Sequence, residues 1–239
     1  MRDSSDKTPI WKAIASALRS DLAEGRYTPG DKLPTEAALA NRFGVNRHTV
    51  RHGISVLVEE GLVRTRRGAG AFVAATPTDY PIGQRVRFHE NLNAAGRRPE
   101  KRRLALDERA ATIGEAQALQ IEAGDPVCAY HGLLLADGQP IAVFESLFPL
   151  ARLGGITAAL KETSSVTEAL SVVGIDDYTR ASTRLTAVRA TATHALLLHV
   201  AEGDPLLRSS SLNHSQGGLP VESGRTWFAG DRVTLTLEA

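Results

Sequence analysis

Residues 35–59 of this 239-residue chain contain two short helical patterns joined by a turn, and a hairpin pattern follows them. Thr35 can cap the first helix, and Gly44 can end it. Asn46 can cap the second helix, and Gly61 can close it. Two helices joined by a short turn that contains Gly are typical of a helix-turn-helix unit. The spacing therefore predicts a small helical unit with a β-hairpin beside it.

The second of these helices carries its cations on the outside. Its apolar residues Val50, Ile54 and Leu57 recur at helical spacing, so they should face inward. Recognition helices contact base edges with their first residues, which predicts a DNA-binding helix here. The following hairpin, with strands at 62–66 and 71–73, is basic and resembles a wing. The outward residues at the start of the helix are Arg47, His48, Arg51 and His52.

The basic charge of the chain is concentrated in this first part. Residues 1–75 hold 12 Lys and Arg against 8 Asp and Glu, whereas residues 76–239 hold 16 against 19. A solvated helix face would also carry charge, but here the caps, the turn, the hairpin and the charge coincide. The overall charge of +1 is too small for a purely electrostatic DNA coat, which favours sequence-specific binding.

The stretch AEGRYTPGDKLPTEAALANRFGVNRHTVRHGISVLVEEGLVRTRRGAGAFV resembles the winged-helix domain of GntR-type bacterial transcription regulators. One difference is Ala37, where some relatives carry an arginine, so the resemblance implies the binding mode and not the operator sequence. It implies DNA contacts by Thr35, Asn46, Arg47, His48, Thr49 and Arg51, and by Arg66, Arg67 and Gly68 at the wing.

Composition along the chain predicts two domains. An apolar stripe at 11–22 predicts one more helix before the helix-turn-helix unit. The stretch ATPTDYPIGQR is rich in Thr, Pro and Gly and lacks any periodicity, which indicates a linker. We therefore expect a DNA-binding domain at 1–75, a linker at 76–84 and a second domain at 85–239.

The second domain contains an internal repeat. EAQALQIEAGDPVC at 115–128 matches HALLLHVAEGDPLL at 194–207, 79 positions later. After each Gly-Asp-Pro come a strand-like run, a turn, a proline and a second strand-like run. Two helix-then-hairpin units can merge into one antiparallel sheet covered on one face by helices, with a further strand at 180–188. The whole chain is therefore predicted to be α+β.

This second half resembles the ligand-sensing (UTRA) domain of the HutC branch of GntR-type regulators, whose fold is similar to that of chorismate lyase. The pieces that carry the resemblance are RVRFHENLNAAGRRP, LLLADGQPIAVFESLFPLARLGGI, DYTRASTRLTA and FAGDRVTL. Within the branch, the chain is most similar to phosphonate-metabolism regulators. Relatives that sense sugar phosphates often carry arginines where this chain has Gly132 and Leu134. The resemblance implies a small anionic effector.

Phosphate or phosphonate binding needs guanidinium groups and oriented N–H donors. Two places qualify, the segment Arg85 to His89 and the segment Ser164 to Thr167. An ion pair at a surface or interface is an equal explanation for each arginine. By resemblance, effector contacts fall on Phe88, His89 and Ser165, with Glu145 and Glu222 lining the pocket. Physical reasoning adds Arg87, Tyr178, Arg180 and Arg184, because Arg180, Ser182 and Arg184 should alternate onto one strand face.

Enzymatic and metal sites find little support. No nucleophile accompanies a base, and neither a cofactor motif nor a third ligand beside His48 and His52 is evident, so no metal or cofactor is expected. The single cysteine, Cys128, lies in an apolar run and is expected to be a buried hydrophobe. No apolar run approaches the roughly 20 residues of a membrane span, so a cytoplasmic protein is expected.

Together these features predict a homodimeric, ligand-controlled repressor that binds two half-sites of a near-palindromic DNA operator. A phosphonate- or phosphate-containing effector is the main expectation. The alternatives are a HutC-type regulator that senses a sugar phosphate or a urocanate-like acid, and, more remotely, a chorismate-lyase-like enzyme.

Overall fold

The computed structural model describes residues 9–66, 68–74, 77–85 and 87–237. The chain forms two compact units that divide between Thr76 and Pro77, and each is described by itself. None of the helices in these described ranges combines the length and apolar character that a bilayer crossing requires.

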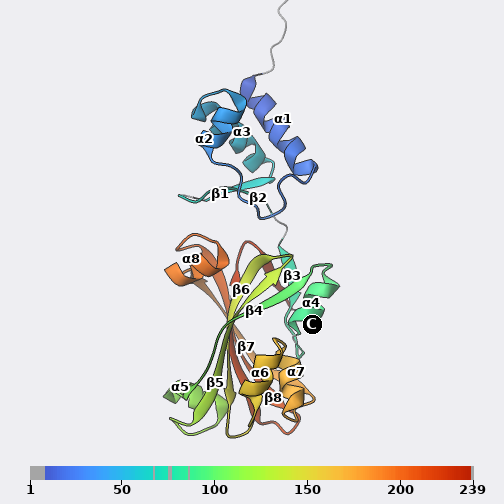
Figure 1. The fold of residues 1–239 in the computed structure, drawn as a ribbon, viewed down its shortest axis with the longest axis vertical. Helices are drawn as coiled ribbons and strands as arrows, with labels where there is room; N and C mark the ends of the chain where they lie inside the picture. The colour runs from blue at the N-terminus through green and yellow to red at the C-terminus, as the bar shows by residue number, and fades with distance from the viewer. Residues whose placement is uncertain (1–8, 67, 75–76, 86, 238–239) are drawn as a thin grey trace, which may run out of the picture. The chain divides into compact units, whose positions relative to one another are not determined.

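The first unit contains three helices and a two-stranded antiparallel hairpin (Figure 1). The Thr35 hydroxyl accepts a hydrogen bond from the Ala38 N–H at 3.2 Å, and Asn46 Oδ1 accepts one from the Thr49 N–H at 2.9 Å. Both predicted helix caps are thus confirmed. The elements are α1 (Ile10–Ala23), α2 (Glu36–Phe43), α3 (Arg47–Glu59), β1 (Val63–Arg66) and β2 (Gly70–Val73).

Helices α1 and α3 cross closely in the core of this unit. Ile14 and Leu18 of α1 pack with Val50 and Leu57 of α3, all of them buried. A Cβ added to Gly53 of α3 would lie 2.9 Å from Ile14 Cγ2, so only glycine fits the crossing without a shift.

The second unit is built on a six-stranded antiparallel sheet with strand order β4-β5-β6-β9-β8-β7. The two predicted hairpins, β5–β6 and β8–β9, merge through β6 and β9. The elements are β3 (Thr78–Pro81), α4 (Phe88–Ala94), β4 (Pro99–Ala110), α5 (Ile113–Leu119), β5 (Pro126–Ala136), β6 (Gln139–Pro149), α6 (Ile156–Glu162), α7 (Val166–Val172), β7 (Tyr178–Arg189), α8 (Ala192–Leu198), β8 (Pro205–Ser215), β9 (Pro220–Ala229) and β10 (Val233–Thr236).

Two expectations about this unit are wrong. The stretch 76–84 is not a linker throughout, because residues 78–81 form β3, which pairs in parallel with β10. Helices also cover both faces of the sheet rather than one: α4, α6 and α7 lie on one side, and α5 and α8 lie on the other (Figure 1). The reason is that the central strands β5 and β6 bury almost every side chain, so both of their faces need a cover.

The internal repeat extends to two arginines that follow the hairpins. The Arg152 guanidinium donates hydrogen bonds to the carbonyl of Leu119, at the end of α5, and to that of Pro220, at the start of β9. The Arg232 guanidinium donates to Leu198, at the end of α8, and to Pro140 of β6. Each arginine therefore joins the helix of its own repeat to the hairpin of the other.

Candidate functional site

The start of α3 presents the predicted cations to solvent. Arg47 and His48 are exposed, and the Arg51 side chain is 64% exposed. Arg51 donates a forked pair of hydrogen bonds to Glu36 of α2, at 2.9 and 2.7 Å, which holds the guanidinium in place on the surface. The same hydrogen bonds lower the pKa of the Glu36 carboxyl. The surface geometry is therefore compatible with a duplex contact.

Other predicted DNA contacts have structural partners within the unit. Thr35 and Asn46 cap α2 and α3, and the Thr49 hydroxyl donates to Asn46 Oδ1 at 3.0 Å. The His52 side chain is exposed, as expected, and its ring stacks on that of Trp11 of α1, with the ring centroids 4.3 Å apart. Contact of Thr35, Asn46 and Thr49 with DNA stays a prediction.

The wing carries cations on an aromatic ring. The Arg66 guanidinium lies 4.8 Å from the ring centroid of Phe72, and Lys32 Nζ lies 6.0 Å from it. Gly68 turns the hairpin at φ 75°, and Arg67 lies outside the described residues. Lys32 lies in the segment before the helix-turn-helix unit, and this segment is hydrogen-bonded to β2 on both sides of the bridge between Lys32 and Phe72.

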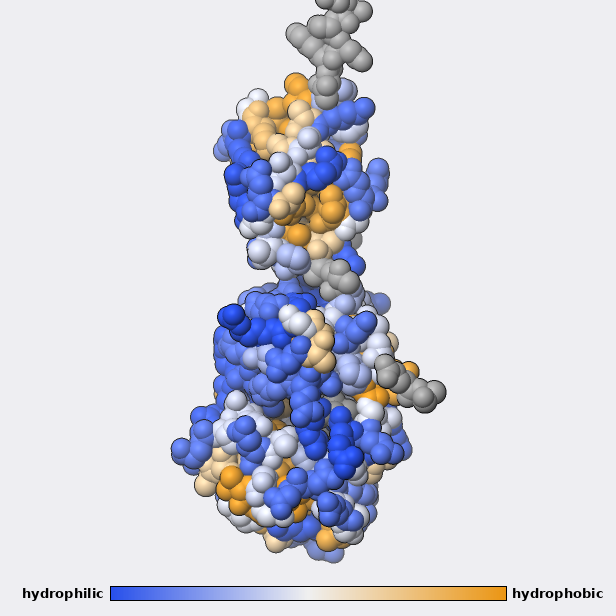
Figure 2. Space-filling view, turned by 90° about the vertical axis from the view of Figure 1, so that its right-hand side faces the viewer, coloured by the Kyte–Doolittle hydropathy of each residue, from blue (hydrophilic) through white to orange (hydrophobic). Residues whose placement is uncertain are grey.

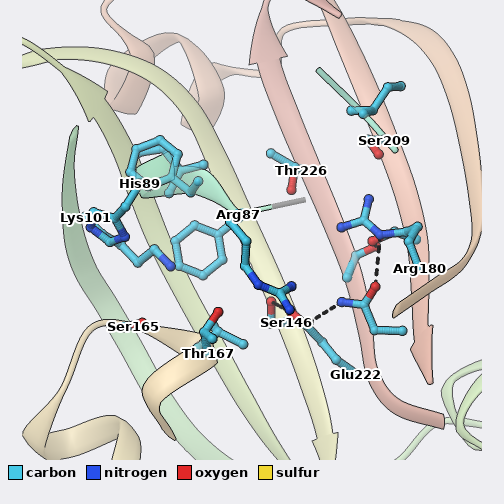
Figure 3. Close-up of a pocket in the computed structure, with 18 of the residues that line it drawn as sticks. Arg87, His89, Lys101, Ser146, Ser165, Thr167, Arg180, Ser209, Glu222 and Thr226 are labelled. Atoms are coloured by element: carbon cyan, nitrogen blue, oxygen red, sulfur yellow. Dashed lines mark hydrogen bonds between the residues drawn. The ribbon is translucent and has the colours of Figure 1, made fainter. Parts of the chain in front are cut away.

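A cavity of about 390 Å³ lies in the second unit between the sheet and the first residues of α4 and α7 (Figure 3). The two segments proposed as separate anion sites thus border a single site. Its floor is rich in hydroxyl groups from Ser146, Ser209, Ser211 and Thr226. The predicted effector residues that line it are Arg87, Phe88, His89, Ser165, Tyr178, Arg180 and Glu222.

The predictions that Glu145 and Arg184 line this cavity are wrong. Ser146 faces the cavity, so its neighbour Glu145 points to the opposite face of the sheet, where it lies 3.7 Å from Arg225. In β7 a register shift between Arg180 and Ser182 breaks the expected alternation, so Arg180 reaches the cavity and Arg184 does not.

Arg87 is held at the edge of the cavity by β7. Its side chain is only 13% exposed, and the guanidinium lies 4.0 Å from the Tyr178 ring centroid and 3.7 Å from Asp177 Oδ1. Arg85 instead forms an exposed ion pair with Asp177, and their hydrogen bond lowers the pKa of that carboxyl. The structure thus separates the two arginines of this segment into a cavity residue and a surface residue.

The floor also contains a buried carboxylate. Glu222 is 8% exposed, and it accepts hydrogen bonds from the Ser146 hydroxyl at 2.5 Å and from Asn213 Nδ2 at 2.6 Å. Neutral groups therefore orient Glu222 toward the cavity. Arg180 is fixed beside it, because its Nε donates to Asn213 Oδ1 at 2.9 Å.

Three charged residues that line the cavity, Glu90, Lys101 and Glu168, are not among the predicted residues, and Lys101 is the cation among them. It lies on β4, whose sequence PEKRRLALDERA shows no clear alternation and was not assigned as a strand. The surface of the second unit on the side of α4, α6 and α7 is mainly hydrophilic (Figure 2).

Across the described ranges, no three His, Cys, Asp or Glu side chains lie together in a way that could hold a metal ion.

Comparison with known proteins matches both units. The family described as bacterial regulatory proteins, gntR family, matches residues 11–73, and the UTRA domain matches residues 94–234. The chain is 36% identical over 230 residues to an uncharacterized HTH-type transcriptional regulator, RB1450, of Rhizobium meliloti (strain 1021), covering 96% of this chain and 94% of the relative.

Two further similarities concern proteins named PhnF. The chain is 33% identical over 238 residues to the probable transcriptional regulator PhnF of Escherichia coli (strain K12), covering 95% of this chain and 94% of that protein. The crystal structure of PhnF from Mycobacterium smegmatis superposes with a TM-score of 0.65 at 26% identity, covering 95% of this chain and 98% of that one.

Proposed function

Because this chain belongs to the GntR family of bacterial regulatory proteins and carries a UTRA domain, we propose that it represses genes of phosphonate uptake or degradation in response to a small phosphate- or phosphonate-containing effector. The family and its relatives are transcriptional regulators, so the chain is a regulator and not an enzyme. The observation that carries the effector proposal is the cavity, which brings Arg87, Arg180 and Lys101 together over a hydroxyl-rich floor.

The effector class can be tested by thermal unfolding of the full chain with inorganic phosphate, alkylphosphonates, sugar phosphates and urocanate. Binding of a ligand to the folded state raises the midpoint, so a shift with alkylphosphonates is expected. Stabilisation by urocanate alone would overturn the proposal. The hydroxyl groups of Ser146, Ser209, Ser211 and Thr226 favour a sugar phosphate as the second candidate, because they match a polyhydroxylated ligand.

We also propose that the protein acts in the cytoplasm as a homodimer whose two recognition helices occupy the half-sites of a near-palindromic operator. The cavity wall includes Tyr80 and Ile82, which belong to the segment that follows directly on the inter-unit connection. The Arg180 N–H donates to the carbonyl of Gln84 in the same segment, at 2.8 Å. An effector that contacts Arg180 can therefore act on the chain that leads to the DNA-binding unit.

This control proposal is tested by selecting operator DNA from a random pool and measuring its affinity with and without the stabilising ligand. An effector can shift the equilibrium only by its different affinity for the two states of the protein. A weaker affinity for the operator in the presence of the ligand is expected for release of a repressor. An unchanged affinity would contradict the proposed control.

A further inference from the structure

Lys101 projects from the edge strand β4 into the effector cavity. Its partner across the β4–β5 register is Leu134, and both residues line the cavity. Lys101 Nζ lies 5.3 Å from the ring centroid of Phe144 and 5.9 Å from that of Phe88. Figure 3 shows Lys101 on the same side of the cavity as His89. The ammonium group is therefore placed between two aromatic side chains.

The aromatic neighbours of Lys101 are fixed by close packing. A Cβ at position 132 would lie 2.4 Å from Phe144 Cε1, so glycine at this position leaves the space that the Phe144 ring occupies. The other side of that ring packs edge-on against Tyr130 at 5.0 Å. The position of the ammonium group is thus prepared before any ligand enters.

The Lys101 ammonium group has unused hydrogen-bonding capacity. Within the part of the chain that the structure describes, its Nζ makes neither a hydrogen bond nor an ion pair, although it carries three donors. Burial lowers the pKa of Lys101 to about 8, while the Glu222 charge acts in the opposite direction. Keeping this ammonium charged and unpaired costs the ligand-free protein free energy, and an anion in the cavity would remove that cost.

We propose that Lys101 binds the tetrahedral oxyanion of the effector, a phosphomonoester or a phosphonate, inside the cavity that Arg87 also lines. This inference rests on the proposed effector-sensing function. It identifies the residue that gives the cavity its affinity for the anionic group. The cation comes from β4 rather than from β5, where Gly132 and Leu134 carry no charge.

The first test compares Lys101→Met with Lys161→Met, which removes an exposed lysine of α6 outside the cavity. The full-length proteins are titrated by calorimetry with inorganic phosphate, methylphosphonate and N-acetylglucosamine 6-phosphate. A charged hydrogen bond contributes about 1.5–3 kcal/mol, so K101M is expected to bind roughly 10- to 100-fold more weakly than K161M. The probe that binds wild type distinguishes a phosphonate from a phosphomonoester or free phosphate.

The second test uses proton linkage, which a merely structural role would not change. Anion binding raises the pKa of Lys101, so wild type should lose affinity relative to Lys101→Arg by about tenfold between about pH 7.5 and 9.5. The ligand titrates identically in both experiments, so the ratio of the two affinities reports on the lysine. The other charged or titratable side chains that face the cavity are Tyr80 of β3, Arg87, His89 and Glu90 of the α4 segment, Glu168 of α7, Tyr178 and Arg180 of β7, and Glu222 of β9.

Three of these neighbours, His89, Tyr80 and Tyr178, have pKa values that are shifted away from the pH range of the test. Burial and the charge of Lys101 lower the pKa of His89, whereas burial raises that of Tyr178 and raises that of Tyr80 to about 12. Thermal unfolding of K101M should match or exceed that of wild type, because methionine suits the aromatic slot and carries no charge.

The outcomes separate the two proposals. Equal affinity of K101M and K161M, or identical pH dependence of wild type and K101R, would overturn the role of Lys101 and leave the effector proposal standing. Failure of wild type to bind any of the three probes would overturn both.

Discussion

Two glycines, Gly53 and Gly114, lie within helices and differ in what surrounds them. A side chain at Gly53 would meet Ile14 of α1 at 2.9 Å and the carbonyl of Trp11 at 3.2 Å, whereas a side chain at Gly114 would meet nothing within 4 Å. The same substitution should therefore have opposite effects at the two positions.

We expect Gly53→Ala to destabilise the first unit by about 1–3 kcal/mol, because the added methyl group forces α1 and α3 apart. Gly114→Ala is the matched control and should be neutral or stabilising by up to about 1 kcal/mol, since alanine favours a helix. Thermal unfolding of the two variants measures both effects. A Gly53→Ala protein as stable as wild type would show that the helices can separate freely.

Glu115 shows how one carboxylate can make stability depend on pH. It is buried, accepts hydrogen bonds from both terminal nitrogens of Arg109 at 2.8 and 2.9 Å, and accepts a third from the Thr112 N–H. The hydrogen bonds from Arg109 are the main reason that the pKa of Glu115 falls to about 2, against the opposing effect of burial. The carboxylate therefore binds its proton less readily in the folded state than in the unfolded state.

A lowered pKa in the folded state contributes stability above the unfolded value, and that stability is lost as the pH falls through the folded value. Glu115 should thus contribute at most about 3 kcal/mol near neutral pH, and the contribution should decline from about pH 4.5 down to about pH 2. Urea unfolding of wild type and Glu115→Gln at neutral pH and near pH 3 measures this. The difference between the two proteins should shrink in acid; a constant difference would contradict the assignment.

At the scale of elements, the internal repeat in the sequence correctly predicted the helices and hairpins that have strong local sequence patterns. The two Gly-Asp-Pro segments and their hairpins are present as expected, because helix caps, turns and apolar runs all act within a few residues. Strand β4 was missed because an edge strand is exposed on both faces and need not alternate. The register shift in β7 is a tertiary feature without a sequence signal, so Arg184 was assigned to the wrong face.

The same limits apply to the effector cavity. Seven of the predicted residues border it: four lie at the starts of α4 and α7, which can be recognised locally, and three lie on strands β7 and β9. Predicting Lys101 as a cavity residue requires recognising β4 as a strand. Choosing between Glu145 and Ser146 requires knowing which face of β6 is turned toward α4 and α7. Sequence patterns define the alternation of a strand but not which of its two faces meets a given helix.

Arg232 provides a test of how the two repeats hold each other. It is 6% exposed and donates to carbonyls of β6 and of the end of α8. We expect Arg232→Met to lower the free energy of unfolding by about 3 kcal/mol, because buried carbonyl groups lose their donors. Arg102→Met, which removes an exposed arginine paired with Glu100, should change stability by less than about 1 kcal/mol. Equal urea midpoints for the two variants would contradict this role.

At the scale of the whole molecule, DNA binding offers a matched pair of arginines. Arg51 and Arg19 both form exposed ion pairs with a glutamate at 2.7 Å, but Arg51 lies at the start of α3 and Arg19 pairs with Glu60 at its other end. Arg51→Ala, like Arg47→Ala, should cost about 1–3 kcal/mol of operator binding if the side chain contacts a base. Arg19→Ala should leave the affinity unchanged. Fluorescence anisotropy with operator and non-operator DNA measures both, and equal binding by wild type and an Arg47/Arg51 double alanine variant would contradict the proposed interface.

The crossed arginine contacts of the second unit have a consequence for how that unit folds. The Arg152 guanidinium donates a hydrogen bond to the carbonyl of Pro220 in the later repeat, and the Arg232 guanidinium donates one to the carbonyl of Pro140 in the earlier repeat. Each guanidinium group also has carbonyl partners in its own repeat, but the bonds to Pro220 and Pro140 that join the two repeats form only when both repeats are present. Folding of this unit should therefore be a single all-or-none step, and a nascent chain released before residue 232 should remain a target for proteases and chaperones.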